Sequence, residues 1–443
     1  MTTNIRPFFS HYIGFDEEAH AFFALNFEHF GTSKVPFLLI GTNCGRCLLF
    51  SSISLKQIAV LHDDTERRQI VAIGRWPFEE EIKNASSSSG GAIVIWLHFR
   101  CHSVALFELF FSDCGQQTVA NSVPQFRPLR ELRTGHYGFC RALSDPVAGR
   151  MFIPDHEELS SSVRICYRNG GEKVLVLAQH FMYKSWATRT NRSINETFAE
   201  DGTMFSGLLM GMELLSGDHV LLAYEDSTVC VFNLATKSVV DALKHPQRPE
   251  FLCWSVLRVP DGDGICGANA AAAAATNSAT LRALVAVSVL GQVYLLTVCA
   301  TADGGRFGVL GGNGTTALML RAGCKVKKRD SACTALAFYG GAGQQQQHWH
   351  TVGRLVTGFK DGFIEIRSVL APPTTGGHWT TILDAQCDFH TAAGAAIRVL
   401  AVDGPVPSAQ WPNDPSPLHL FFLFAGASDG KVSLFLRRHQ QQQ

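Results

Sequence analysis

Residues 422–436 read FLFAGASDGKVSLFL: an apolar strand, a tight turn of small and acidic residues, and a second strand that alternates apolar and polar side chains. Residues 354–369, RLVTGFKDGFIEIRSV, repeat the pattern. Each stretch predicts an antiparallel hairpin, because Asp361-Gly362 and Asp429-Gly430 tolerate the positive φ that both central residues of such a turn require. The same form recurs at 38–50, 220–234 and 284–296, and with weaker turns at 93–111 and 151–168.

An apolar stretch of strand length precedes each hairpin. These first strands are expected at 20–27, 69–76, 138–144, 208–215, 251–259, 332–339 and 395–402. Outer strands are expected at 56–62, 172–180, 237–245 and 379–386. Sheets of four antiparallel strands, repeated seven times, cannot bury both faces alone and must pack against their neighbours. The sequence therefore predicts an all-β protein, a seven-bladed β-propeller of the WD-repeat kind.

The last blade lacks an outer strand of its own. Residues 5–13, IRPFFSHYI, can supply that strand, so we expect an N-terminal strand to close the ring. The prediction is one propeller over residues 1–439 followed by a Gln tail at 440–443. Its blades are expected to start near residues 20, 69, 136, 208, 251, 332 and 395.

The chain is longer than seven blades require. Five low-complexity, polar or Pro/Gly-rich stretches account for the surplus, and these are predicted to be loop inserts. Four of them join the first strand of a blade to its second, which places them on one face: 79–91, 261–280, 340–352 and 403–417. The fifth, 181–205, joins the third blade to the fourth and emerges on the opposite face.

Composition narrows the function. Lys plus Arg number 38 and Asp plus Glu number 38, so the chain has no net charge to attract nucleic acid or an anionic membrane. The first residues lack a basic segment followed by a long apolar run, which predicts a soluble, non-secreted protein. Most of the 13 cysteines lie in apolar strands, as expected in a reducing compartment.

Two segments resemble a known family. GFCRAL, at 138–143, is similar to a segment in the third blade of the family of guanine nucleotide-binding protein subunit beta-like protein 1, called ASTRA-associated protein 1 in fungi. LLAYEDSTVCVFNLATKSVV, at 221–240, resembles the Tyr-Glu-Asp hairpin in the fourth blade of that family. The closing AGASDGKVSLF, at 425–435, is similar to its last hairpin. The chain departs from the WD pattern, because no Trp-Asp dipeptide ends a hairpin and Ser227 stands where glycine is usual.

The resemblance implies a non-catalytic scaffold for protein–protein interactions that is associated with the triple-T co-chaperone and ASTRA system. That system supports maturation of phosphatidylinositol 3-kinase-related kinases and chromatin regulation. The implied partners are triple-T and ASTRA subunits and those kinases, and the implied location is the cytoplasm and the nucleus. Two alternatives stay open: a G-protein β-like signalling adaptor, and an enzyme whose site is built from loops on the propeller face.

The candidate protein-interaction residues are Phe139, Arg141, Tyr224, Glu225 and Asp226 in the two resembling segments, and Trp186 in the insert 181–205. Trp186 lies among Lys184, Arg189 and Arg192, and an aromatic side chain in a basic cluster can anchor a partner. The alternative is that the first five are turn and core positions and that Trp186 rests on its own blade.

Other motifs favour structural roles. Cys44 and Cys47 form a Cys-x-x-Cys pair, but a hairpin turn lacks the helix N-terminus of a redox dithiol and no second pair completes a zinc site. His348 and His350 flank Trp349 in a polar loop, and His136 fits a structural Gly-His position. Phosphate-loop, metalloprotease and nucleophile-elbow motifs are absent. We expect no catalytic residue, metal or cofactor, and no G-protein γ subunit, because the short N-terminal segment contains Pro7 and no apolar heptads.

Overall fold

The computed structural model describes part of the chain in strands and tight turns. The described residues are 3–4, 7, 9–13, 17–25, 37–51, 55–76, 93–111, 124–134, 138–145, 147–157, 160–167, 171–176, 184–185, 208–216, 218–244, 251–258, 280–289, 291–301, 317–326, 330–339, 351–370, 380–388, 395–406 and 420–438. Within these ranges the structure contains thirty β-strands and no helix, and hence no helix that could cross a membrane.

The strands form seven antiparallel sheets, and the fold is the predicted seven-bladed β-propeller. We number the sheets as blades 1 to 7 by their first strands, β3, β7, β11, β16, β20, β24 and β28. The chain divides into two compact units. The closure unit, Ile5–Leu177 with Asp388–Gln443, contains blades 7, 1, 2 and 3, and the middle unit, Met1–Asn4 with Ala178–Cys387, contains blades 4, 5 and 6.

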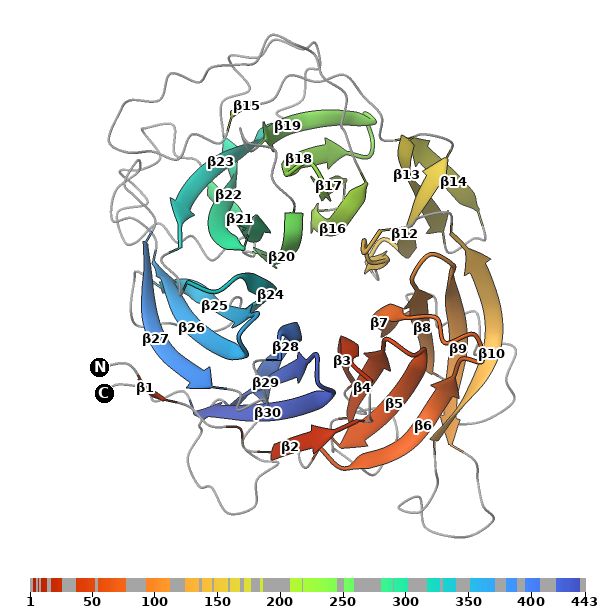
Figure 1. The fold of residues 1–443 in the computed structure, drawn as a ribbon. Helices are drawn as coiled ribbons and strands as arrows, with labels where there is room; N and C mark the ends of the chain where they lie inside the picture. The colour runs from red at the N-terminus through yellow and green to blue at the C-terminus, as the bar shows by residue number, and fades with distance from the viewer. Residues whose placement is uncertain are drawn as a thin grey trace. The chain divides into compact units, whose positions relative to one another are not determined.

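In the closure unit the sheets lie side by side, and β3 packs against both β28 and β7 (Figure 1). Blade 7 consists of β28 (Ile397–Val406), β29 (Leu420–Ala427), β30 (Lys431–Arg438) and β2 (Phe9–Tyr12). Blade 1 consists of β3 (Ala19–Leu25), β4 (Phe37–Thr42), β5 (Arg46–Ser51) and β6 (Gln57–Asp63). Blade 2 consists of β7 (Ile70–Arg75), β8 (Ile93–Phe99), β9 (Ser103–Phe111) and β10 (Pro124–Arg133). Blade 3 consists of β11 (Leu143–Asp145), β12 (Arg150–Glu157), β13 (Ser160–Tyr167) and β14 (Glu172–Val176).

The middle unit repeats the four-strand plan. Blade 4 consists of β16 (Leu209–Ser216), β17 (His219–Tyr224), β18 (Thr228–Asn233) and β19 (Ser238–Lys244), with the short β15 (Lys184–Ser185) parallel to β19. Blade 5 consists of β20 (Phe251–Arg258), β21 (Thr280–Val289), β22 (Gln292–Thr301) and β23 (Ala317–Lys325). Blade 6 consists of β24 (Cys333–Tyr339), β25 (Thr351–Phe359), β26 (Phe363–Leu370) and β27 (Thr380–Asp388), with β1 (Thr3–Asn4) parallel to β27.

The core lies between blades. On β4, Leu38 and Ile40 belong to the apolar cluster that includes Phe424 of blade 7, whereas Leu39 belongs to the cluster that includes Ile95 of blade 2. This follows from the strand period of two, which sends successive side chains to opposite faces of a sheet. Similar clusters join blade 2 to blade 3, blade 4 to blade 5 and blade 5 to blade 6. The central strand β4 is therefore apolar on both faces.

The predicted closing strand is confirmed. Residues Phe9–Tyr12 form β2, which pairs antiparallel with β30 in the register Phe9↔Leu434 to Tyr12↔Lys431. The hydroxyls of Ser10 and Ser433 lie 2.6 Å apart across this pair. The N-terminal segment thus provides the fourth strand of blade 7.

The two Asp-Gly turns differ from the prediction. Positive φ occurs at Gly362 (84°) and Gly430 (78°) but not at Asp361 or Asp429. The amide of Gly362 donates to the carbonyl of Phe359 at 3.1 Å, so the central residues of that turn are Lys360 and Asp361. A type I turn followed by a left-handed glycine, a common three-residue hairpin loop, explains this geometry. Only the glycine therefore needs positive φ.

The first strand of blade 3 is also shorter than predicted. The expected strand at 138–144 is reduced to Leu143–Asp145. The amide of Ala142 donates to Nδ1 of His98 at 3.1 Å instead of to a neighbouring strand, which leaves Gly138–Ala142 as a connection. The outer strands β10 and β23 were not predicted. Three strands continue into predicted inserts: β28 reaches Val406, β25 begins at Thr351 and β21 begins at Thr280, while most insert residues lie outside the described residues.

A register shift of one residue recurs at the second position of the first strand in six blades. The bulged residues are His20, Val71, Met210, Leu252, Thr334 and Arg398. A β-bulge leaves one residue outside the regular pairing and re-aims its side chain. The bulge occupies an equivalent backbone position in these six blades, and the type of residue at that position differs from blade to blade.

Candidate interaction face

Turns and blade connections lie at one end of each sheet. In an antiparallel sheet of four strands, the turn between the second and third strands and the exit from the fourth are on the same side. Backbone hydrogen bonds join the two: the amide of Asp64 donates to the carbonyl of Gly45, and the amide of Arg100 donates to that of Gln69. We call this end the connection face, and in the closure unit it carries most of the polar side chains described below.

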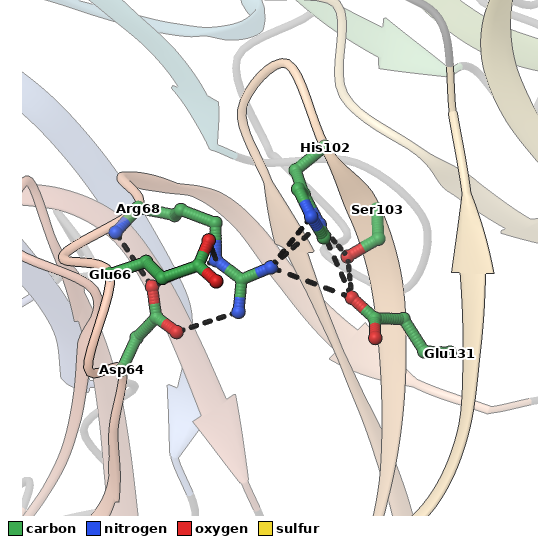
Figure 2. Close-up of polar contacts among 6 residues, drawn as sticks. All are labelled: Asp64, Glu66, Arg68, His102, Ser103 and Glu131. Carbon is green, nitrogen blue, oxygen red and sulfur yellow. Dashed lines mark hydrogen bonds and ion pairs between the residues drawn. The ribbon is translucent and has the colours of Figure 1, made fainter.

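A polar network on this face ties blade 1 to blade 2 (Figure 2). Arg68, in the connection before β7, donates from Nε and Nη2 to the two carboxylate oxygens of Asp64 at 2.9 and 2.7 Å. Nη1 of Arg68 lies 2.7 Å from Nδ1 of His102 in the β8–β9 turn. The hydroxyl of Ser103 donates to Glu131 on β10 at 2.5 Å, and Glu131 lies 3.2 Å from Nδ1 of His102.

The network uses its charges internally. The hydrogen bonds from Arg68 hold the pKa of the Asp64 carboxyl below its ordinary value, and Asp64 in turn raises the pKa of Arg68. Figure 2 shows Arg68 between Asp64 and Glu66 on one side and His102 and Glu131 on the other. The polar network holds the β8–β9 turn, which contains Arg100, against the connection from blade 1.

A second group surrounds His20, the bulged residue of β3. Nδ1 of His20 lies 2.8 Å from the side-chain amide of Gln69, and Nε2 lies 3.3 Å from Glu18. Glu18 also lies 3.2 Å from Nε of Arg398, the bulged residue of β28. Burial, together with the charges of Arg398, Arg141 and Arg100, lowers the pKa of His20 to about 4. The imidazole is therefore neutral at pH 7 and its Nδ1 can accept from Gln69.

The predicted residues Phe139 and Arg141 lie beside this group, in the connection from blade 2 to blade 3. The guanidinium carbon of Arg100 lies 3.7 Å from the centre of the Phe139 ring, within the range of a cation–π contact. Phe139 remains 45% exposed and Arg141 is exposed. The hydrogen bond from Ala142 to His98 holds the connection in place. The connection face of the closure unit thus presents an aromatic ring next to arginines.

The predicted residues Tyr224, Glu225 and Asp226 form the β17–β18 turn of blade 4. Tyr224 is 1% exposed. Asp226 accepts a hydrogen bond from Nζ of Lys244 at 2.5 Å, and these two side chains are 9% and 4% exposed. Glu225 is exposed, and its carboxylate accepts from the amide of Leu208 at 3.3 Å. In this turn, Tyr224 and Asp226 face the interior and Glu225 reaches solvent.

Trp186, His136, His348 and His350 lie outside the described residues. Next to Trp186, Lys184–Ser185 forms β15 and pairs with Leu243 and Lys244. Lys184 and Ser185 of the insert 181–205 therefore lie alongside the outer strand of blade 4.

The Cys44 and Cys47 pair occupies the β4–β5 hairpin, as predicted. Cys47 is buried on β5, and burial raises the pKa of its thiol. Cys44, in the turn, lies 3.2 Å from Nη2 of Arg67, and both line a pocket of about 670 Å³. In the part of the chain that the structure describes, no three His, Cys, Asp or Glu side chains are arranged to hold a metal ion.

Sequence reasoning missed Arg100, Arg398, His20 and Glu18. They come from three blades, and no motif spacing links them. One signal exists: an alignment of the blades on their hairpin turns places His20 and Arg398 at the same bulged position of β3 and β28.

The strands and these surfaces define the protein as a seven-bladed β-propeller. No protein-family model and no curated protein matches the chain. Matches among solved structures number 1043 chains, so the architecture is widespread. One is the crystal structure of Chaetomium thermophilum Raptor, with a TM-score of 0.50 and 9% sequence identity over 98% of this chain. This chain spans 29% of the Raptor chain, and at such identity the likeness concerns the fold alone.

Proposed function

We propose that the protein is a non-catalytic scaffold that binds other proteins through its connection face. A β-propeller is consistent with such a role, because its turns and connections display side chains from several blades. The observation that carries the proposal is the exposed Phe139 ring beside Arg100 and Arg141. Aromatic residues and arginine contribute most of the binding energy at protein interfaces.

The system in which the scaffold works is proposed from the resembling segments at 138–143 and 221–240. They support a place with the triple-T co-chaperone and ASTRA system, which acts in the cytoplasm and nucleus on phosphatidylinositol 3-kinase-related kinases and on chromatin. The first segment contains Phe139 and Arg141, so the part of the chain that resembles the family includes part of the proposed interface.

Affinity purification of the tagged full chain, followed by mass spectrometry, tests this function. We expect triple-T or ASTRA subunits or the kinases to be recovered reproducibly. The matched variants are Phe139→Ala, which removes the exposed ring, and Leu129→Ala, which removes an exposed apolar side chain from the outer strand β10. Recovery should fall with the first and not with the second.

Two results would contradict the proposal. If repeated purifications recover no protein partner, the proposed scaffold role is wrong. Recovery of a stable G-protein γ-like subunit would instead support the signalling adaptor.

A further inference from the structure

Three arginines from three separate parts of the closure unit gather around His20. Arg398 is on β28 of blade 7, Arg100 is in the β8–β9 turn of blade 2, and Arg141 is in the connection to blade 3. A continuous set of contacts links Arg398 to Arg100: Arg398 to Glu18, Glu18 to His20, His20 to Gln69, and Gln69 to the backbone of Arg100. Arg141 lies two residues after Phe139, whose ring contacts the guanidinium of Arg100. We call Arg100, Arg141, Arg398 and Phe139 the arginine patch.

Part of the positive charge of the patch is exposed to solvent, because Arg141 and Arg398 are exposed. His20, at its centre, is a neutral imidazole at pH 7 and adds no charge. Arg398 is 44% exposed although it contacts Glu18. The buried Nε of Arg100 has no hydrogen-bond partner among the described residues, and the guanidinium lies over the ring of Phe139. Positive charge held on fixed side chains attracts an anion.

The surroundings limit the size of that anion. The polar network of Figure 2 begins one residue from Gln69 and two from Arg100, and two of its carboxylates, Glu66 and Glu131, are exposed. These acids repel a long polyanion such as a nucleic acid, and the chain has no net charge to offset that repulsion. A short acidic stretch needs only one or two anionic groups on the arginines, one of which, Arg398, also contacts Glu18. Phe139 offers an apolar surface beside them.

We propose that the arginine patch binds an acidic segment of a partner polypeptide, with a carboxylate or phosphate group on the arginines and an apolar side chain against Phe139. This proposal rests on the proposed scaffold function and specifies the chemistry of the partner. Arginine suits the role because its planar fork of donors matches a carboxylate or a phosphate in bidentate geometry.

The first test measures binding of labelled peptides to the purified full chain by fluorescence anisotropy at low ionic strength. The probes are a short peptide of alternating Glu and Leu, the same peptide with Gln for Glu, and the same peptide with phosphoserine for Glu. We expect saturable binding of the Glu or phosphoserine peptide and at least about tenfold weaker binding of the Gln peptide, because charge-assisted hydrogen bonds are lost. The stronger of the two anionic probes identifies the preferred group.

The variants Arg141→Gln and Arg398→Gln should each weaken binding by about tenfold. The matched control is Arg130→Gln, which removes an exposed arginine from the outer strand β10, where it pairs with Glu172. Phe139→Ala should weaken the Leu-containing peptide more than a peptide of alternating Glu and Gly. Circular dichroism melting of each variant checks that it is folded.

Three outcomes would overturn the proposal: binding of neither anionic peptide, equal binding by the wild type and both arginine variants, or tighter binding of a single-stranded oligonucleotide than of either peptide. Failure of the patch is distinguishable from failure of the scaffold function. Affinity purification can be repeated with a double variant that carries both Arg141→Gln and Arg398→Gln. If this variant recovers the same partners as the wild type, the scaffold function stands and the proposed binding by the arginine patch is wrong.

Discussion

Both units contain β-bulges at the second position of the first strand, but the bulged residues differ in chemistry between the two units. In the closure unit the bulged residues include His20 and Arg398, and their neighbours Arg100 and Arg141 reach the surface. In the middle unit the bulged residues are Met210, Leu252 and Thr334, none of which carries a charge. There, Asp226 pairs with Lys244, and both side chains are almost completely buried.

This difference separates residues that maintain the fold from residues available to a partner. The segments 221–240 and 138–143 both contain charged and aromatic residues, yet the first turns Tyr224 and Asp226 inward and the second leaves Phe139 and Arg141 exposed. A distinctive sequence is thus not by itself a binding site. The direction in which the backbone aims each side chain decides its use.

The largest expected effect is on the buried pair. Asp226→Ala leaves the Lys244 ammonium buried without its carboxylate, and we expect a loss of about 3–5 kcal/mol in the free energy of unfolding. Urea denaturation followed by fluorescence measures it. Replacing both partners with apolar residues, Asp226→Leu with Lys244→Met, should restore much of the loss.

The matched change in the closure unit is Glu18→Gln, which breaks the exposed contact with Arg398. It should cost no more than about 1 kcal/mol. Equal losses for Asp226→Ala and Glu18→Gln would show that the two units do not differ in how they use charge.

The next effect is a pH dependence of the closure unit. The pKa of His20 is about 4 in the folded protein and 6.5 in the unfolded chain. Between pH 4 and pH 6.5, therefore, the unfolded chain binds a proton at His20 that the folded chain does not bind. The contribution of His20 to stability is therefore lost as pH falls from about 6.5 towards 4. His20→Gln should remove this loss, on the order of 2–3 kcal/mol near pH 4, and change little of the slope above pH 7.

Histidine NMR titration provides the independent check. Arg398→Gln should raise the pKa of His20 while leaving it below its ordinary value, because burial is the larger cause of the shift. An unchanged His20 pKa in that variant would place Arg398 outside the patch.

A smaller effect should be the same in both units. Gly362→Ala in the middle unit and Gly430→Ala in the closure unit each force an alanine into the left-handed region, which costs about 1–2 kcal/mol. The control is Lys360→Ala, at a turn position without positive φ, which should change stability by less than about 0.5 kcal/mol. Unequal costs for the two glycines would mean that the hairpins are not equivalent.

The sequence was sufficient for six of the seven first strands and for β2, because these segments are apolar runs bounded by turn residues. It was insufficient for β10, PQFRPLRELR, whose side chains are mostly exposed and which contains two prolines. An outer strand packs on one side only, so its hydrophobic pattern is weak. The strand at 138–144 was overpredicted because an apolar segment can be buried as a connection when a side chain such as His98 satisfies its amide.

The candidate site was predicted only in part for a different reason. Phe139 and Arg141 are close in sequence and lie in one resembling segment, whereas Arg100, Arg398 and His20 meet through the packing of blades far apart in the chain. Composition and motif spacing do not reveal that residues far apart in the chain lie close together in the fold. Only the bulge, which repeats at the second position of six first strands, makes the equivalence of His20 and Arg398 visible.

The smallest expected effect on stability, and the sharpest separation of fold from function, concerns Arg141. Its side chain is exposed, so Arg141→Gln should change the free energy of unfolding by no more than about 0.5 kcal/mol in urea denaturation. The same variant should weaken binding of the acidic peptide about tenfold, because the peptide loses a charged donor. A loss of several kcal/mol would instead make Arg141 a counterpart of Asp226, a charge that the protein uses to hold its own blades, and the contrast between the two units would disappear.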